Sequence, residues 1–152
     1  MDVTRKAATA FDHKKLQING NYINGFSIGE KVSSVLKSMS VTNGTLKVLN
    51  SSKKEKKSTD IIATGDYITV YDADGKVFKQ YQAVLYGDVD GDGEVNIFDH
   101  TEVKIHCWYA PSLTGAYLEA ANVDTSSEGV DIFDMVDIKI YMWYNGTIKQ
   151  TR

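Results

Sequence analysis

Oxygen-bearing side chains are concentrated in one twelve-residue segment, residues 88–99. Gly93 stands at position 6 of this segment, and carboxylates occupy positions 1, 3, 5 and 12: Asp88, Asp90, Asp92 and Asp99. Calcium takes about six to eight hard oxygen ligands, and a loop with this spacing can wrap them around one ion. Glu94 at position 7 would add its backbone carbonyl, and Asn96 is a further candidate at position 9. The alternative is an Asp/Gly-rich turn without metal, in which four crowded carboxylates would repel one another.

The same pattern returns 35 residues further along the chain. Val95-Asn-Ile-Phe-Asp99 is echoed by Val130-Asp-Ile-Phe-Asp134, and Trp108-Tyr109 by Trp143-Tyr144. The offset holds without a gap from residue 95 to residue 109. A constant offset of this length indicates a duplicated supersecondary unit.

The second loop is less regular than the first. Counting back from Asp134 places Val123 at position 1, where its side chain offers no ligand. One inserted residue gives a 13-residue loop with these candidate ligands: Asn122, Asp124, Ser126, Asp131 and Asp134. The loop has fewer carboxylates and no glycine at the turn position. We therefore expect weaker calcium binding here, with a loop that holds no calcium as the alternative.

Each loop is followed by an expected helix, over residues 97–109 and 132–144. At about 100° per residue, one stripe of the first helix contains Ile97, Thr101, Lys104, Ile105 and Trp108. Its equivalents in the second helix are Ile132, Val136, Lys139, Ile140 and Trp143. A different stripe carries His100, Val103 and Cys107, matched by Met135, Ile138 and Met142. Two short paired helices can bury one stripe each, so the other stripe predicts an exposed interaction surface.

The duplicated loop–helix unit resembles the dockerin modules of cellulosome-type assemblies. The resemblance covers residues 86–148 and includes a connection with the sequence Leu118-Glu-Ala-Ala-Asn122. It implies an all-α dockerin fold with two calcium loop–helix repeats, related by a pseudo-twofold axis. It also implies that the exposed helix face binds a cohesin module of a scaffold protein.

The resemblance further implies which residues contact the cohesin. Loop positions 10 and 11 and the later contact positions fall on Ile97, Phe98, Lys104, Ile105, Trp108, Ile132, Phe133, Lys139, Ile140 and Trp143, and Thr101 and Val136 share the same stripes. The best-known dockerins carry small hydroxyl residues at positions 10 and 11. The Ile-Phe pairs depart from that pattern and predict a more apolar cohesin surface. Because the two faces are nearly identical, we expect two symmetry-related binding modes.

The N-terminal half is expected to be a small β-rich α+β domain. Strands are predicted at 46–49, 67–70 and 81–85, with a hairpin turn at Asp74-Gly75 and an amphipathic helix at 30–39. By position and composition it looks like the X-type accessory modules that often precede dockerins. The expected organisation is a linker or leader at 1–15, this module at 16–85, the dockerin-like module at 86–148 and a tail at 149–152. With no Pro/Ser linker at residue 85, the modules should pack directly on each other.

Composition and charge exclude several classes of protein. The single Cys107 excludes a disulfide framework, and no apolar run is long enough for a membrane span. Residues 1–85 carry a net charge of +5 and residues 86–152 one of −8. The acidic half is a poor match for nucleic acid. The basic run Lys53, Lys54, Lys56 and Lys57 reads as a solvated loop, with a polyanion site as the alternative.

No catalytic constellation is evident, so we expect no enzymatic activity. The three histidines have no metal-ligand spacing, and Cys107 reads as a core residue without an activating charge. The prediction is a non-catalytic, calcium-dependent dockerin, monomeric by itself, that anchors an extracellular bacterial protein in a multi-protein complex for polysaccharide degradation. The alternative is a carbohydrate-binding β module with a calcium-stabilised cap. The extracellular setting rests on the resemblance.

Overall fold

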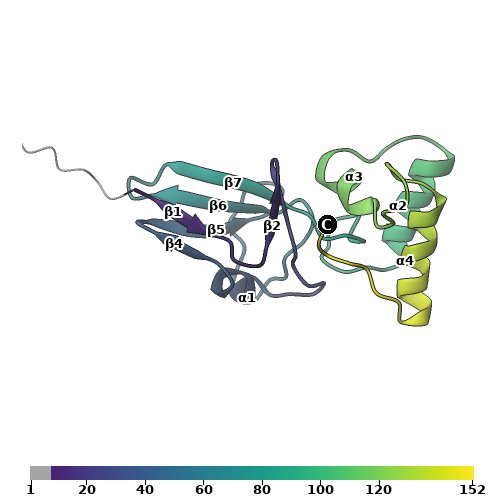
Figure 1. The fold of residues 1–152 in the computed structure, drawn as a ribbon, viewed down its shortest axis with the longest axis horizontal. Coiled ribbons are helices and arrows are strands. Elements are labelled where there is room, and N and C mark those ends of the chain that lie inside the picture. Colours follow the sequence, from purple (N-terminus) through teal and green to yellow (C-terminus); the bar gives the residue numbers. More distant parts are fainter. Residues whose placement is uncertain (1–7) are drawn as a thin grey trace, which may run out of the picture.

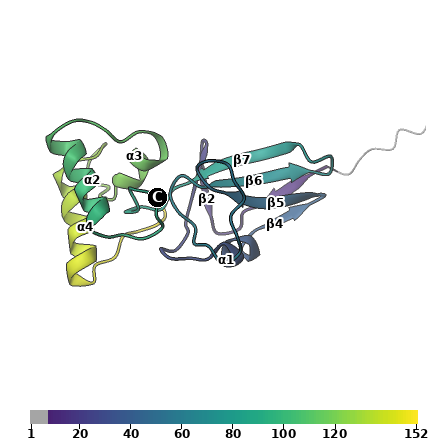
Figure 2. The same ribbon diagram turned by 180° about the vertical axis from the view of Figure 1, so that it is seen from behind.

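The structure of the protein, a computed structural model, describes residues 8–152. It consists of two lobes placed side by side along the long axis of the molecule (Figures 1 and 2). Residues 8–85 form a β lobe, and residues 86–152 form a helical lobe in which α2 (Ile97–Trp108) packs on α4 (Ile132–Tyr144). A β-rich N-terminal region followed by a helical C-terminal region confirms the coarse architecture expected from the sequence.

The main sheet of the β lobe has five strands in the order β2-β3-β7-β6-β5. Their bounds are β2 (Gln17–Asn19), β3 (Tyr22–Asn24), β5 (Gly44–Leu49), β6 (Tyr67–Asp72) and β7 (Val77–Ala83). β3 and β7 are parallel, whereas the other neighbours are antiparallel. The hairpin predicted at Asp74-Gly75 is confirmed, since it joins β6 to β7.

A separate pair of strands corrects the expected N-terminal boundary. β1 (Ala10–Asp12) pairs with β4 (Ser40–Thr42), so the folded region reaches into residues 1–15, which the sequence assigned to a linker or leader. The physical reason is that Phe11 packs against the core of the β lobe. Residues 1–7 of the expected linker lie outside the described part of the chain.

The helix expected at 30–39 is present but shorter. α1 (Val32–Lys37) starts later because Lys31 is held in an extended bridge to Ile61 and the carbonyl of Glu30 accepts the N–H of Ile62. The helix buries Val32 and Val35 in the core of the β lobe, as its apolar spacing predicts.

The helical lobe contains a third helix that the sequence analysis did not predict. α3 (Gly115–Ala121) occupies the connection between the two loop–helix units. It buries Ala116, Ala120 and Ala121 against Val103 of α2 and Ile138 of α4, in one cluster of buried side chains. Alanine side chains are small enough for this short helix to pack closely against α2 and α4. A helix that buries only alanines lacks the row of large apolar residues from which an amphipathic helix is predicted.

Residues 83–86 join the lobes without a linker. Ala83 and Leu85 belong to the core of the β lobe, whereas Val84 and Tyr86 belong to the core of the helical lobe. This alternation is the period of an extended chain, in which successive side chains point to opposite sides. The predicted direct packing of the two halves is therefore built into the crossing segment.

The C-terminal tail, residues 148–152, returns to this crossing point. Gln150 forms two hydrogen bonds with the backbone of Tyr86: its Oε1 accepts the N–H at 2.9 Å, and its Nε2 donates to the carbonyl at 2.8 Å. The guanidinium of Arg152 stacks on the Tyr86 ring, 3.7 Å from its centroid, and donates to the carbonyl of Asn122. The backbone N–H of Arg152 donates to Gln17 Oε1 of the β lobe at 2.7 Å. The tail thus contacts both lobes.

Replacing Gln150 by alanine should destabilise the fold by about 1–3 kcal/mol, because Tyr86 is completely buried and its N–H and carbonyl would lose their partner. Urea denaturation measures this change. The matched control is Lys149→Ala, an exposed neighbour in the same tail, which should change stability little. Equal stability of the two variants would contradict a structural role for the tail.

Candidate functional site

The loop that leads into α2 folds around the completely buried carboxylate of Asp88. Its Oδ1 accepts the backbone N–H groups of Gly91 and Asp92, both at 3.0 Å, and its Oδ2 accepts that of Gly93 at 3.1 Å. A fourth N–H comes from Thr64 of the β lobe, at 2.7 Å from Oδ2. These bonds hold the loop in a closed turn around its first carboxylate.

Asp99 closes the loop from the other end, at the third residue of α2. Its Oδ1 accepts the N–H groups of Val89 and Asp90, and its Oδ2 accepts that of Asn96 at 2.7 Å. In return, the Asn96 side chain accepts the N–H of Phe98 at 2.9 Å, which completes a capping box. The loop and the start of the helix are therefore one hydrogen-bonded unit.

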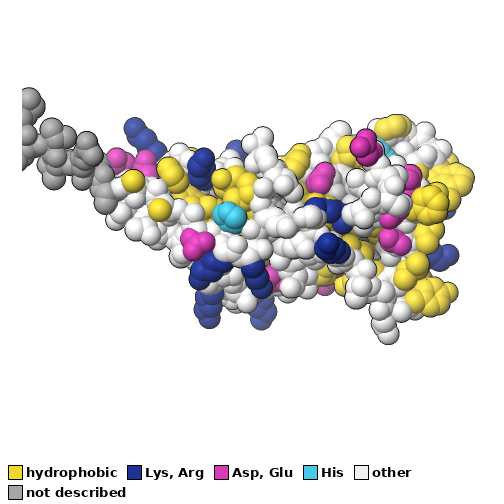
Figure 3. Space-filling model, viewed as in Figure 1, with side chains coloured by type: hydrophobic (Ala, Val, Ile, Leu, Met, Phe, Trp, Pro, Cys, Tyr) yellow, Lys and Arg dark blue, Asp and Glu magenta, His cyan; other side chains and the backbone are white. Residues whose placement is uncertain are grey.

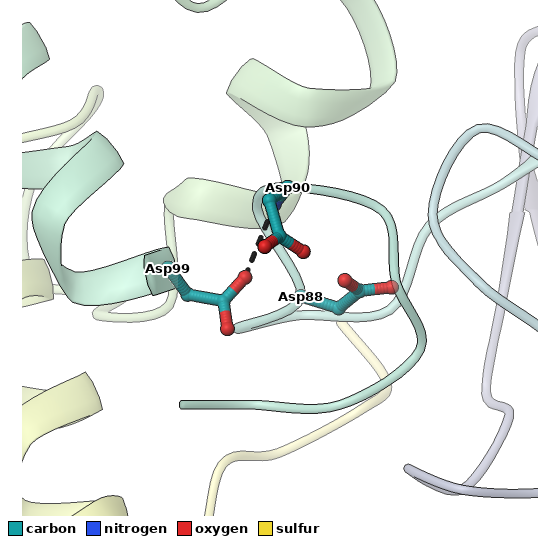
Figure 4. Close-up of side chains that lie close together, drawn as sticks. All are labelled: Asp88, Asp90 and Asp99. Carbon is teal, nitrogen blue, oxygen red and sulfur yellow. Dashed lines mark hydrogen bonds between the residues drawn. The ribbon is translucent and has the colours of Figure 1, made fainter. Parts of the chain in front are cut away.

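Three carboxylates of this loop could hold a metal ion. One oxygen each from Asp88, Asp90 and Asp99 lies within 4.8 Å of the others, and this is the only such group of acidic, histidine or cysteine side chains found in residues 8–152. Figure 4 shows the three side chains around the turn, with Asp90 and Asp99 linked by a backbone hydrogen bond. Calcium–oxygen bonds of about 2.3–2.6 Å span about 4.6–5.2 Å between opposite ligands, so oxygens within 4.8 Å of one another are close enough to share one calcium ion.

The other expected ligands of the first loop lie outside this group. Asp92 and Glu94 are exposed, and the Asp92 Oδ1 accepts the N–H of Glu94 at 2.8 Å. The Nδ2 of Asn96 lies 3.4 Å from Asp92 Oδ2, while its Oδ1 caps the helix. Of the five predicted side-chain ligands, the structure therefore gathers Asp88, Asp90 and Asp99 and leaves Asp92 and Asn96 outside the group.

The carboxylates in this loop are costly to ionise without a cation. Burial is the main cause that raises the pKa of Asp88 to about 7, and the neighbouring charges of Asp99 and Asp92 raise it further, while hydrogen bonds from Thr64 and Gly93 lower it. Burial likewise raises the pKa of Asp99 to about 6, against three backbone hydrogen bonds that lower it. A bound cation would offset both the desolvation and the mutual repulsion.

The second loop repeats part of this arrangement. Asp134 accepts the N–H groups of Asp124 at 2.8 Å and Asp131 at 2.7 Å, as Asp99 does for Asp90 and Asn96, and Asp131 caps α4 through the N–H of Phe133. Asp90 precedes Asn96 by six residues, whereas Asp124 precedes Asp131 by seven. The extra residue lies between them, which agrees with the 13-residue count.

The remaining oxygens of the second loop are less converged. The Oδ1 of Asn122, which corresponds to Asp88, is buried and has no hydrogen-bond partner. Ser126 Oγ donates to Asp124, and Ser127 Oγ donates to Asp131 at 2.6 Å, which lowers the pKa of Asp131. Ser127 lies outside the set of ligands predicted from the sequence. An unpartnered buried oxygen is a group that a cation or a water molecule would satisfy.

The predicted contact stripes lie on the outer side of α2 and α4. Figure 3 shows hydrophobic side chains gathered at the end of the molecule that lies away from the β lobe. The exposed fractions are 65% for Phe98, 61% for Trp108, 59% for Phe133 and 66% for Trp143. Of the twelve predicted contact residues, Ile105 is half-buried and the others are exposed: Ile97, Phe98, Thr101, Lys104, Trp108, Ile132, Phe133, Val136, Lys139, Ile140 and Trp143. The opposite stripes bury Val103 and Ile138, as predicted.

Two shallow cavities lie where the start of one helix meets the end of the other. One, of about 360 Å³, is lined by Ile97 of α2 and Tyr141, Met142 and Trp143 of α4. The other, of about 240 Å³, is lined by Lys104, Trp108 and Tyr109 next to Met135 of α4. The equivalent tryptophans of the two repeats, Trp143 and Trp108, each line one of these cavities. We name the exposed surface formed by the twelve predicted contact residues of α2 and α4 the α2/α4 face.

Two hydrogen bonds to the loops could not be predicted from the sequence. Thr64 of the β lobe contributes a hydrogen bond to the first loop, and the tail residue Arg152 contacts the first residue of the second loop. No local pattern marks either residue, since both act through contacts with residues more than 20 positions away.

Comparisons with protein-family models, with curated proteins and with solved structures found no match for this chain. No helix in residues 8–152 has the length and apolar character needed to cross a membrane.

Proposed function

We propose that the chain is a non-catalytic, calcium-stabilised assembly module of the dockerin type. Its α2/α4 face binds a cohesin module of a scaffold protein and thereby anchors the parent protein in an extracellular complex. The observation that carries this proposal is the set of exposed apolar side chains on the packed helices α2 and α4, each of which begins at a carboxylate-bearing loop. Contiguous exposed apolar surface of this kind is typical of protein–protein interfaces.

The proposed ion in the first loop would be held by Asp88, Asp90 and Asp99, with Asp92, Asn96 and the Glu94 carbonyl as further ligands. A weaker second ion would use Asn122, Asp124, Ser126, Asp131 and Asp134. Calcium neutralises the clustered carboxylates and orders the helix starts. Because Asp99 and Asp134 also cap α2 and α4, cation binding would stabilise the helices that present the α2/α4 face.

Calcium titration by calorimetry tests the metal sites directly. The wild-type chain should show two binding events, and Asp88→Ala should lose one of them because it removes a central ligand of the first loop. The control is Asp12→Ala, which removes a carboxylate from β1 of the β lobe, outside both loops. One event in the wild type would confine calcium to the first loop, and no binding would overturn the proposal.

Calcium binding should also release protons at mildly acidic pH. With pKa values of about 7 for Asp88 and about 6 for Asp99, both carboxyls are partly protonated at pH 6 and must lose these protons to coordinate a cation. We expect about 1.4 protons released per ion at pH 6 and almost none at pH 8, so affinity rises with pH between these values. Calorimetry in two buffers with different ionisation enthalpies measures the release. Identical binding enthalpies in both buffers at pH 6 would contradict this expectation.

The alternative function, carbohydrate binding by the β lobe, has less support. Tyr67 and Tyr71 alternate with the core residues of β6, but the ammonium groups of Lys53 and Lys47 lie over their rings, 4.8 Å and 6.0 Å from the centroids. A sugar would need to displace these lysines in order to stack. Pull-down with insoluble polysaccharides, in parallel with cohesin binding, separates the two functions.

A further inference from the structure

The first candidate loop is built against the β lobe, whereas the side-chain oxygen at the equivalent position of the second loop accepts no such bond. One of the four N–H groups that hold Asp88 belongs to Thr64, in the segment that precedes β6. The last carboxylates of the two loops, Asp99 and Asp134, are both held by N–H groups of their own loop. The Oδ1 of Asn122, at the position of Asp88, has no partner. The two loops therefore differ in what positions their first oxygen ligand.

The contact between the first loop and the β lobe is close. The N–H of Gly29 donates to the carbonyl of Gly93 at 3.2 Å. A Cβ at Gly93 would lie 2.7 Å from Ile61 Cδ1 and 2.8 Å from the carbonyl oxygen of Ile62, and one at Gly91 would lie 2.8 Å from the carbonyl oxygen of Thr64. The glycines of this loop thus permit the approach of the β lobe as well as the sharp turn.

We propose that the β lobe is part of the first metal site. The N–H of Thr64 positions the Asp88 carboxylate, and Ile61 holds the loop at Gly93, so that cation binding in the first loop and docking of the two lobes stabilise each other. Thr64 and Ile61 are positioning residues in this scheme, because they act on the loop and do not touch the ion. The inference rests on the calcium role proposed above.

The physical basis is the fixed orientation of a buried ligand. A carboxylate that keeps a hydrogen bond to a rigid donor loses less freedom when it coordinates a cation, so its affinity for the cation is higher. Linkage is reciprocal: the factor by which the docked β lobe raises cation affinity is the factor by which the cation favours docking. The second loop, which lacks the bond, serves as an internal reference in the same chain.

Calcium titration of the full chain with Ile61→Ala tests the proposal. Ile61 is half-buried and lies against Gly93. We expect the affinity of the first loop, identified by its loss in Asp88→Ala, to fall about tenfold, a loss of about 1.4 kcal/mol, while the second event keeps its affinity. The control is Leu36→Ala, a half-buried side chain packed on the core of the β lobe, which should lower overall stability and leave both calcium affinities unchanged.

Hydrogen exchange provides a second readout that needs no variant of the β lobe. Calcium should slow the exchange of the Thr64 amide in the wild type and should not do so in Asp88→Ala. An unchanged first-loop affinity in Ile61→Ala, or a Thr64 amide that does not respond to calcium, would overturn the coupling while leaving the calcium sites in place. Equal weakening of both events in Ile61→Ala would also overturn it. A wild-type chain that binds no calcium would overturn both this inference and the proposed function.

Discussion

Calcium at 1 mM is expected to raise the melting temperature of the chain by about 8–16 °C relative to excess chelator. For one site with a dissociation constant of about 1 μM, that concentration stabilises the folded state by about 4 kcal/mol. In a protein of this size, each kcal/mol shifts the melting temperature by about 2–4 °C. Circular dichroism at 222 nm follows the loss of α2 and α4 directly.

The structural reason is that the carboxylates of Asp99 and Asp134 are both expected calcium ligands and members of the capping boxes of α2 and α4. Asp99 and Asp134 are both buried, and burial raises the pKa of each. At neutral pH, in chelator, the loops must hold these charges in a poorly solvated environment while the same groups cap α2 and α4. We therefore expect the helical lobe to lose order first when calcium is removed.

Magnesium at equal ionic strength is the control, because it prefers a smaller octahedral site and keeps more of its water. It should raise the melting temperature much less than calcium. The variant Asp99→Ala should be less stable than the wild type in both conditions and should lose most of the calcium response. A melting temperature that is the same in calcium and in chelator would contradict the proposed stabilisation.

Cohesin binding should disappear only when both halves of the α2/α4 face are altered. The aromatic pair on α2, Phe98 and Trp108, and the pair on α4, Phe133 and Trp143, occupy equivalent positions and are similarly exposed. If each helix supports one of two equivalent modes, loss of one pair leaves the other mode intact and lowers the affinity only about twofold. Loss of all four should weaken binding more than about 100-fold, since buried aromatic side chains contribute about 2–4 kcal/mol each at interfaces.

Surface plasmon resonance against a panel of cohesin modules compares three variants with alanine at the α2 pair, at the α4 pair and at all four positions. Val77→Ala, which removes an exposed apolar side chain from β7 in the β lobe, is the matched control and should bind like the wild type. Loss of binding with one pair alone would exclude the two-mode arrangement and identify the dominant helix. Unchanged affinity with all four alanines would exclude the α2/α4 face as the docking surface.

Short sequence patterns predicted those helices and turns whose characteristic residues lie close together along the chain. The 35-residue repeat predicted α2 and α4 with two stripes on each, and the resemblance assigned the contact positions. In the structure Val103 and Ile138 are inaccessible, while Phe98 and Phe133 are exposed. The hairpin around Asp74-Gly75 was equally readable, because a turn dipeptide between alternating strands specifies its own register. α3 was missed because its alanines carry no amphipathic signal.

The candidate metal centre was likewise only partly predictable from the sequence. The sequence by itself determined which oxygen ligands are available and their order around each loop, because loop spacing is a local property of the chain. Only the tertiary structure decided that Thr64 holds Asp88 and that the tail joins Tyr86 to Asn122. These contacts join residues that are distant along the chain, and they form only when the two cores have packed on either side of residues 83–86. Packing of this kind depends on the whole fold, so no local pattern encodes it.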